Sequence, residues 1–488
     1  MTRQLAAIRD ALVRAGLLVD GRGALPAAIA GVTDDSRVGV ADALFLAVRG
    51  AERDGHDYLA SAAERGAAAA MVDDPSRTSL PTLVVTDTRR AAAVAAAAFY
   101  DEPARSLRLL GVTGTNGKTT TVGMLRHLLD EVDARAASIG TLGVLVGGDG
   151  EPLDGGGGLT TPGPIELQRV LRALLDRGVR TVAMEASSHA LHQRRVEGLV
   201  FAAGVFTNLT RDHLDYHGTM ESYFEAKAQL VGQLAPDGVA VINADDPAWE
   251  KLPRVPRTVR FGSTRSADVH ATDVRCTPDG SRFALVFDGK PHEVALPLLG
   301  DFNVANALAA AACAWAVGVA PETIVARLGT MPQVPGRLEI VSARPTVLRD
   351  YAHTPDALER AIDAVRPFAI GRLIVVFGCG GDRDRGKRPE MGRIAVDRAD
   401  VVIATSDNPR TEDPERILDD IEAGMHGAEH ERIEDRRAAI ARALAIAAPN
   451  DLVLLAGKGH ETYQVRGTTK LPFDERAIVR EILQEKHS

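Results

Sequence analysis

The nine residues from Gly111 to Thr119, GVTGTNGKT, constrain the fold of this 488-residue chain more than any other segment. An apolar run that is typical of a buried strand precedes them, and a helical pattern, GKTTTVGMLRHLLDEV, follows. Glycines at such a junction let backbone N–H groups approach phosphate oxygens, and the helix N-terminus favours an anion. The usual spacing would place a glycine at Val112, where this chain has Gly111 and Gly114 on either side. We therefore predict a variant phosphate loop; the alternative is a glycine-rich turn with a surface lysine.

Within this loop, two side chains carry the chemistry expected of a nucleotide site. Lys118 can reach the β- and γ-phosphates, and the Thr119 hydroxyl can bind Mg²⁺. The cofactors predicted from the loop are therefore ATP and Mg²⁺.

The same design, an apolar run that ends in small or polar residues, recurs along the chain and indicates an α/β protein with parallel sheets. After the phosphate loop it is seen in VRTVAMEASSH, FAAGVFTNLT, GVAVINADD, VLRDYAH, RLIVVFGCGGD, ADVVIATSDNPR and DLVLLAGKGHE. Ligands of such sheets bind at the carboxyl ends of the strands. Residues 258–300 alternate instead, which suggests antiparallel strands, and an alanine-rich helix is expected over Val304–Val317.

These patterns divide the chain into three expected domains, and its length agrees with that number. We place a small N-terminal α/β domain at residues 1–104, a central phosphate-loop domain at 105–335 and a C-terminal Rossmann-like domain at 336–488.

Composition and charge exclude several classes of function. The net charge of −9 argues against a nucleic-acid-binding protein, which usually carries a basic surface. No apolar run reaches the roughly 18 residues that a membrane-spanning helix needs, and the N-terminus has no signal-peptide core. Three cysteines, at spacings that suit neither zinc nor a disulfide framework, favour a reducing compartment. We expect a cytoplasmic protein.

Three further residues are candidate ligands for the metal of the nucleotide. Glu185 ends a buried strand, His213 lies in TNLTRDHLDYHG, and Lys227 lies on an expected helix. Taken alone, they could be a strand-end charge, a helix cap and a solvated lysine. Beside a phosphate loop, Glu185 and His213 favour Mg²⁺ binding. An ammonium would repel a cation, but addition of CO₂ to Lys227 would give an anionic carbamate.

The motifs GTNGKTTT, MEASSH, TNLTRDHLDYHG, GDFNVANALAA, PGRLE, DYAHTPDAL, FGCGGDRDRGKRP and GKGHE occur in this order. Together they resemble the Mur ligases of peptidoglycan synthesis over nearly the whole chain, and in particular the members that add meso-diaminopimelate. The resemblance implies a uridine-nucleotide domain, a central ATPase domain and a Rossmann-like domain. It also implies a reaction in which a carboxylate is activated as an acyl-phosphate and then attacked by an amine.

The resemblance assigns nucleotide and metal roles to positions of this chain. It implies metal binding by Thr119, Glu185, His213 and carbamylated Lys227, and a catalytic role for these groups with Lys118 and His353. The implied nucleotide contacts are Thr113, Gly114, Thr115, Asn116, Gly117, Lys118, Thr119, Thr120, Asn303, Asn306, Arg337, Asp350 and Tyr351.

The resemblance also implies contacts to two substrates, UDP-N-acetylmuramoyl-L-alanyl-D-glutamate and meso-diaminopimelate. For the sugar-peptide the matching residues are Ser36, Thr160, Thr161, Ser187, Gln193 and Arg195. For the amino acid they are Arg383, Asp407, Asn408, Pro409, Arg410, Gly457 and Glu461. An arginine can clamp the distal carboxylate of diaminopimelate, which lysine lacks. The alternatives are a turn at Asp407–Arg410, a solvated basic loop around Arg383 and a turn cap at Ser36.

Other functions stay open at this point. They are an L-lysine-adding or different Mur ligase, a folylpolyglutamate synthase, and a nucleotide-binding module without ligase chemistry. The last predicts no need for His213, Lys227 or the C-terminal arginines. We expect a monomer.

Overall fold

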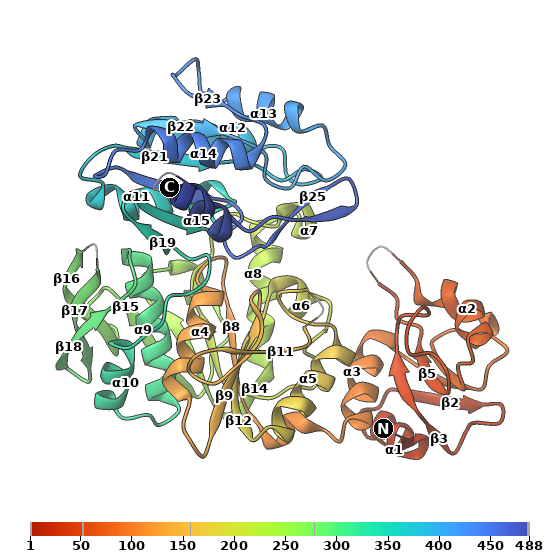
Figure 1. The fold of residues 1–488 in the computed structure, drawn as a ribbon. Helices are drawn as coiled ribbons and strands as arrows, with labels where there is room; N and C mark the ends of the chain where they lie inside the picture. Colours follow the sequence, from red (N-terminus) through yellow and green to blue (C-terminus); the bar gives the residue numbers. More distant parts are fainter. Residues whose placement is uncertain (1, 51–52, 157, 278, 486–488) are drawn as a thin grey trace.

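The computed structural model describes residues 2–50, 53–156, 158–277 and 279–485. Three large sheets follow one another along the chain, each flanked by helices, and the described residues also form two small sheets, β1-β3 and β25-β26 (Figure 1). The C-terminal domain, drawn in blue, lies above the central domain, and the N-terminal domain, drawn in red, lies at one side of it (Figure 1). This is the three-domain α/β fold expected from the sequence.

The N-terminal domain is a five-stranded sheet in the order β2-β7-β6-β5-β4, and its helix α3 packs against α5 of the central domain. Its strands β4 to β7 are parallel. Parallel neighbours need crossover connections, which the intervening loops and helix provide. Its elements are β1 (Arg3–Gln4), α1 (Leu5–Arg14), β2 (Leu18–Arg22), β3 (Ala28–Ile29), β4 (Gly31–Thr33), β5 (Ala43–Leu46), α2 (Leu59–Glu64), β6 (Ala69–Val72), β7 (Thr82–Val85) and α3 (Thr88–Phe99).

The central domain is built on an eleven-stranded sheet in the order β11-β10-β9-β12-β8-β13-β14-β15-β16-β17-β18. The strands from β9 to β16 in this order are parallel, which brings their carboxyl ends to one edge. The strands are β8 (Arg108–Thr113), β9 (Arg135–Gly140), β10 (Gly143–Val146), β11 (Glu151–Leu153), β12 (Val179–Glu185), β13 (Phe201–Phe206), β14 (Leu234–Asn243), β15 (Arg257–Gly262), β16 (Val269–Thr277), β17 (Gly280–Phe287) and β18 (Lys290–Leu296). The helices are α4 (Lys118–Leu129), α5 (Pro164–Asp176), α6 (Ser188–His192), α7 (Leu214–His217), α8 (Met220–Ala228), α9 (Asp301–Ala316) and α10 (Pro321–Leu328).

Two expectations from the sequence need correction here. Only part of residues 258–300 is antiparallel, because β15 pairs in parallel with both β14 and β16, and the antiparallel pairing starts between β16 and β17. The alanine-rich helix begins at Asp301, three residues before the expected Val304. Gly300, with φ at +92°, ends the preceding loop, and the acidic Asp301 suits the positive end of the helix.

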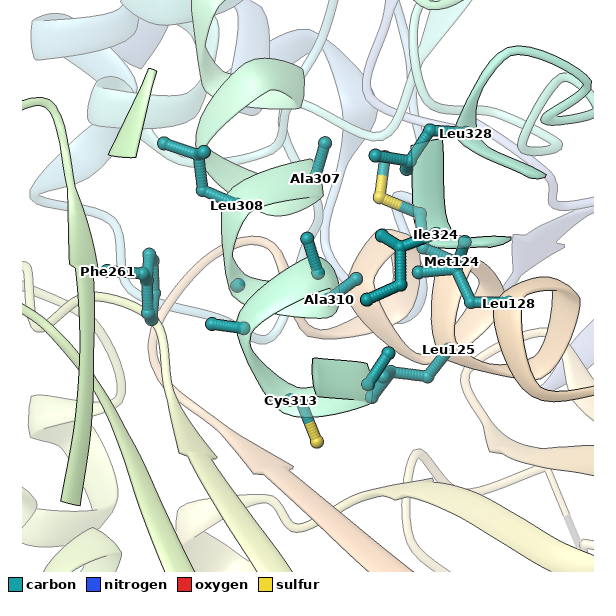
Figure 2. Close-up of a cluster of buried hydrophobic side chains, with 14 of the residues drawn as sticks. Met124, Leu125, Leu128, Phe261, Ala307, Leu308, Ala310, Cys313, Ile324 and Leu328 are labelled. Carbon is teal, nitrogen blue, oxygen red and sulfur yellow. The ribbon is translucent and has the colours of Figure 1, made fainter. Parts of the chain in front are cut away.

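The small side chains of α9 let this helix pack closely between the sheet and two other helices. Figure 2 shows Ala310 on the side of Met124, Leu125 and Leu128 from α4, while Phe261 from β15 lies on the opposite side of α9. This packing fixes the first turn of α9 beside the start of α4. The phosphate loop therefore has a rigid neighbour.

The C-terminal domain is a six-stranded sheet in the order β19-β20-β24-β21-β22-β23, parallel except for β19. Its carboxyl edge faces the central domain, where β20 leads into residues 351–354 and β24 into residues 457–461. Its elements are β19 (Glu339–Ala343), β20 (Thr346–Asp350), α11 (Pro355–Val365), β21 (Leu373–Phe377), α12 (Lys387–Arg398), β22 (Val401–Ala404), α13 (Pro414–Glu422), β23 (Glu431–Arg432), α14 (Arg436–Ile446), β24 (Leu452–Ala456), β25 (Tyr463–Arg466), β26 (Thr469–Pro472) and α15 (Glu475–Glu485).

Within the described part of the chain, no helix has both the length and the apolar character needed to cross a membrane.

Candidate active site

A cavity of about 610 Å³ lies between the carboxyl edges of the central and C-terminal sheets. Its walls come from both domains, so neither sheet forms it alone. The residues singled out in the sequence that line it are Lys118, Thr160, Thr161, Ser187, Arg195, His213, Lys227, Tyr351, His353, Arg383, Asp407, Asn408, Arg410, Gly457 and Glu461.

The phosphate loop joins β8 to α4 and has no room for side chains at two of its glycines. A Cβ on Gly114, where φ is +144°, would overlap the Thr207 hydroxyl. A Cβ on Gly117, where φ is +85°, would overlap the Asn306 amide of α9. Gly117 also leaves the N-terminus of α4 without a side-chain cap. Free N–H groups at a helix start are a ready anion site, so the loop fits a nucleotide phosphate.

Two lysine side chains converge on one carbonyl oxygen of this loop. Lys118 Nζ donates to Gly114 O at 3.0 Å and to Thr115 O at 2.8 Å, and Lys227 Nζ donates to Gly114 O at 2.7 Å. Burial lowers the pKa of Lys118. Burial also lowers the pKa of Lys227 well below its usual value, and the neighbouring charge of Lys118 adds to this effect. Among the described residues, neither amine has a carboxylate within salt-bridge distance, so both can accept a negatively charged ligand.

Glu185 and Thr119 lie at a small pocket beside the loop, which Gly140 also lines. The Glu185 carboxylate is buried and accepts hydrogen bonds from the Thr141 N–H at 2.8 Å and the Thr141 hydroxyl at 3.2 Å. The Thr119 hydroxyl accepts one from Arg337 at 3.1 Å. Hydroxyl and carboxylate oxygens are ligands that Mg²⁺ prefers, so the donors at this point fit the ion.

His213 precedes α7 with φ at +52° and lies between a carboxylate and other imidazoles. Its Nε2 is 3.4 Å from the Asp212 carboxylate, and its ring centroid is 4.8 Å from that of His189. Burial lowers the pKa of His213 to about 4, so the ring is neutral at pH 7 and can act as a ligand through nitrogen. In the described residues no three His, Cys, Asp or Glu side chains form a metal cluster. Of the four predicted ligands, Thr119 and Glu185 line the small pocket, and His213 and Lys227 line the large cavity.

Around the end of β20 lies a compact group of predicted site residues, of which Tyr351 and His353 line the opposite wall of the cavity. The Arg337 guanidinium lies 4.7 Å from the Tyr351 ring centroid. Asp350 accepts hydrogen bonds from the N–H groups of Leu338 at 2.7 Å and Ala352 at 2.9 Å, while burial raises the pKa of its carboxyl to about 6. His353 Nδ1 is 2.8 Å from Tyr351 O, and burial lowers the pKa of His353. A guanidinium, an aromatic ring and a carboxylate together suit a base and a ribose.

The asparagines of α9 lie beside the phosphate loop, where the Asn306 amide is next to Gly117. Asn303 donates to Leu299 O at 2.8 Å, and Asn306 donates to the Asn303 side-chain oxygen at 3.1 Å. The remaining predicted loop residues, Thr113, Thr115, Asn116 and Thr120, lie in the same strand-to-helix turn.

The predicted sugar-peptide residues that belong to the central domain form one hydrogen-bonded group. Arg195 donates to Thr161 O at 3.1 Å and to the Gln193 side-chain oxygen at 2.6 Å, and Thr161 donates to Glu185 O at 2.7 Å. Gln193 itself does not line the cavity, although Arg195 does. Ser36 is buried in the N-terminal domain and is not part of the cavity wall.

The loop after β22 presents Arg410 to the cavity. Arg410 has φ at +53°, donates its backbone N–H to Val465 O at 3.1 Å and donates through its guanidinium to Gly381 O at 2.8 Å. Arg383 donates only to Asp382 O, at 3.3 Å, among the residues that the structure describes. Both guanidiniums line the cavity and keep donors free for a ligand carboxylate. Pro409 lies between Asn408 and Arg410 but is not part of the wall.

Several polar residues of the cavity were not singled out from the sequence. Arg211 and Asp212 belong to the TNLTRDH motif and Lys387 to the DRDRGKRP motif, so the signal was present in the motifs. Lys387 donates to His353 O at 2.7 Å. Asp356 accepts a hydrogen bond from the Asn116 side chain of the phosphate loop at 2.9 Å. Nothing in the sequence indicates this contact between two domains.

Comparisons with known proteins agree with this geometry. Three family descriptions match the chain: "Mur ligase family, catalytic domain" over residues 28–105, "Mur ligase middle domain" over 112–314 and "Mur ligase, glutamate ligase domain" over 336–459. Among similar proteins are two named UDP-N-acetylmuramoyl-L-alanyl-D-glutamate–2,6-diaminopimelate ligase. The one from Gloeobacter violaceus is 45% identical and covers 99% of both chains. The one from Geobacillus kaustophilus is 45% identical and covers 93% of this chain and 94% of its own.

Solved structures give the same result. A structure titled as a UDP-N-acetylmuramoyl-L-alanyl-D-glutamate–2,6-diaminopimelate ligase is 34% identical, with a TM-score of 0.69 and full coverage of both chains. A folylpolyglutamate synthase from Mycobacterium tuberculosis in complex with ADP and AMPPCP shares the fold, with a TM-score of 0.64 and 20% identity over 76% of this chain. The motifs, the cavity and these relatives lead to one conclusion: the chain belongs to the Mur ligase family.

Proposed function

We propose that this protein is the ATP-dependent ligase that joins meso-diaminopimelate to the D-glutamate of UDP-N-acetylmuramoyl-L-alanyl-D-glutamate. The observation that carries the proposal is the single cavity that combines Lys118 and Lys227 of the phosphate-loop side with Arg383 and Arg410 of the opposite side. A nucleotide-binding module would need only Lys118 of these four residues. The names of relatives at 45% identity support the choice of substrates.

In the proposed reaction, the D-glutamate carboxylate takes the γ-phosphoryl group of ATP, and ADP leaves. The amine of diaminopimelate then attacks the acyl-phosphate carbonyl, and phosphate leaves as the amide forms. A carboxylate is a poor acyl donor at neutral pH, and phosphorylation supplies the leaving group. Lys118 and the N–H groups of the loop would hold the phosphates, because they are oriented before the ligand arrives.

Bound Mg²⁺ would neutralise charge on the transferred phosphoryl group. Thr119 and Glu185 would hold one ion beside the γ-phosphate, and His213 and carbamylated Lys227 would hold a second. The structure supports the carbamate through the lowered pKa of Lys227, because only a neutral amine attacks CO₂. In that step the Nζ–C bond forms, one proton leaves the nitrogen, and the product is an anion. It would remove the repulsion between Lys227 and Lys118.

On the substrate side, Arg195 with Thr160, Thr161 and Ser187 would hold the sugar-peptide, and Ser36 would contact its uridine from the N-terminal domain. Arg383 and Arg410 would clamp the distal carboxylate of diaminopimelate, because their free donors face the cavity. Asp407, Asn408, Gly457 and Glu461 would hold its amine end.

The test is release of ADP by the purified protein with ATP, Mg²⁺ and the sugar-peptide, with meso-diaminopimelate or L-lysine as the amine. We expect release only with diaminopimelate. Release with lysine instead would keep the ligase and overturn the role of the arginine clamp. A third outcome is that the protein releases no ADP with either amine but does so with a folate, or with another amino acid and its sugar-peptide. That result would point to a different ligase of the same fold.

We further propose domain limits at 104/105 and 335/336, a monomeric state and a cytoplasmic location. The limits are supported by sheet membership, since β7 ends at Val85, β8 begins at Arg108, β18 ends at Leu296 and β19 begins at Glu339.

The free thiols of Cys276, Cys313 and Cys379 support a reducing compartment. Limited proteolysis and light scattering test the limits and the monomer; cuts inside the sheets or a dimer mass would refute them.

A further inference from the structure

A buried lysine lies directly behind the wall of the cavity at the end of β24. Lys458 is fully buried and does not line the cavity, but its three polar neighbours do. Its ammonium donates to the Asn408 side-chain oxygen at 3.0 Å and to Glu461 Oε2 at 3.3 Å, and it lies 3.8 Å from an Asp407 carboxylate oxygen. A buried cation needs such partners, because burial of an unpaired charge is costly.

Lys458 determines which way the Asn408 amide faces. Two donors, the Lys458 ammonium and the Val465 N–H at 2.9 Å, point to the same terminal atom of Asn408, which must therefore be its oxygen. The Asn408 nitrogen then donates to Glu461 Oε2 at 2.8 Å. Without the lysine, one of the two donors that fix this orientation is lost.

The same contacts leave one oxygen of Glu461 available. Oε2 accepts from both Lys458 and Asn408, whereas Oε1 accepts no hydrogen bond from any residue in the described ranges. The side chain is 14% exposed and lines the cavity. An oxygen held in this way suits an ammonium group of a ligand, which donates three hydrogen bonds and carries a positive charge.

We infer that Lys458 is the positioning residue for ammonium recognition in this cavity. It fixes the Asn408 amide and the Glu461 carboxylate so that Oε1 of Glu461 receives an ammonium of the incoming amino acid. Its charge also balances one of the two carboxylates that lie beside it, Asp407 and Glu461. The inference rests on the proposed function and adds a residue to it.

The experiment replaces Lys458 by Met, which has a similar length but neither charge nor donor. We expect KM for meso-diaminopimelate to rise at least about tenfold, because a charge-assisted contact is misplaced. KM for ATP and for the sugar-peptide should not change. Lys458→Gln keeps a donor for Asn408 without the charge and should give an intermediate KM. Lys470→Met, at an exposed lysine of the same domain, is the matched control.

A second readout separates ammonium recognition from general damage to the pocket. Pimelate has the same carbon chain and both carboxylates but no amine, and it should inhibit wild type and Lys458→Met equally. If Lys458 only supported the fold, pimelate and diaminopimelate would both bind more weakly, and the inference would be overturned. An unchanged KM for diaminopimelate in Lys458→Met would overturn it as well. If Lys458→Met does not fold, Lys458→Gln answers the same questions.

Failure of the proposed function gives a different result. Wild-type protein that releases no ADP with diaminopimelate refutes the function together with the inference. A wild-type enzyme that uses diaminopimelate, with a variant of equal KM, refutes the inference alone.

Discussion

The two sheet edges that face each other across the cavity differ in whether their buried cations have carboxylate partners. On the central edge, Lys118 and Lys227 share one carbonyl oxygen and have lowered pKa values. On the C-terminal edge, buried cations already have carboxylate partners: Lys458 lies with Glu461, and Arg388 pairs with Glu412 at 2.9 Å. The first edge is incomplete without an anion, as a phosphate site should be. On the second edge the buried cations are paired, and the groups left for a ligand are the guanidiniums of Arg383 and Arg410 and Oε1 of Glu461.

The helix N-termini repeat this contrast. At the start of α4, Gly117 offers no side-chain cap and leaves the N–H groups to a ligand. On the C-terminal side, Asp413 caps α13 through the Glu415 N–H, and Thr354 caps α11 through the Ala357 N–H. Where the sequence places its own acceptor, the helix end serves stability. At α4 the glycine leaves the helix start available to a ligand.

Removal of the buried amine of the central edge should have the largest effect. Lys227→Ala should lower kcat by about 1000-fold or more, because charge stabilisation in the transition state is lost. A small carboxylic acid added to the assay should partly restore phosphate release, since it can replace the carbamate. Lys251→Ala, at an exposed lysine, is the control. A Lys227→Ala enzyme with wild-type rates would refute the carbamate.

A change on the C-terminal edge should alter selectivity and leave the nucleotide unaffected. Arg410→Lys should lower kcat/KM for diaminopimelate by roughly 100-fold, because an ammonium cannot replace a bidentate guanidinium. KM for ATP should not change in Arg410→Lys. Arg416→Lys, at an exposed arginine on α13, is the control and should keep wild-type constants for both ATP and diaminopimelate. Equal losses for diaminopimelate and ATP, measured by steady-state kinetics, would contradict the separation of the two edges.

Asp350 predicts a pH dependence of stability. Burial raises the pKa of its carboxyl in the folded protein to about 6 from a usual value of 3.8, so the folded state holds the proton more tightly than the unfolded state. Stability should therefore fall as pH rises from about 4 to 6, by roughly 3 kcal/mol at most, and then level off. Asp350→Asn removes this slope. Denaturant unfolding of both proteins across this range measures it, and parallel curves would count against the prediction.

The smallest effect concerns the capped helix of the C-terminal edge. Asp413→Ala removes the acceptor for the Glu415 N–H and should lower the free energy of unfolding by about 1 kcal/mol. Thermal melting measures the loss, and KM for ATP should not change. An altered KM for ATP would show that the cap also shapes the distant phosphate site.

The sequence predicted best what is encoded by consecutive residues. The phosphate loop and the strand ends that carry Glu185 and Asp407–Arg410 are local patterns, and parallel strands must bring their carboxyl ends together. The direction of β15 was harder, because alternation alone does not tell a parallel strand at the border of the sheet from an antiparallel one.

Contacts between domains could not be read from the sequence. The hydrogen bond from Asn116 to Asp356 spans 240 positions and depends on how two folded domains meet. Lys458 was passed over inside a motif that was otherwise used, because one lysine between glycines gives no sign of burial. Its importance becomes clear only when Asn408, 50 positions away, lies beside it.

The hydrogen bond from Arg337 to the Thr119 hydroxyl has a consequence for how tightly the nucleotide site is organised. A ligand or ion that binds the Thr119 hydroxyl replaces Arg337 as its partner. The Arg337 guanidinium is then free to donate to a phosphate at the neighbouring loop. Part of the entropy of bringing two domains together has been lost before binding, so less of it opposes association. In this sense the protein is a preorganised receptor, because the guanidinium that leaves Thr119 already lies beside the site.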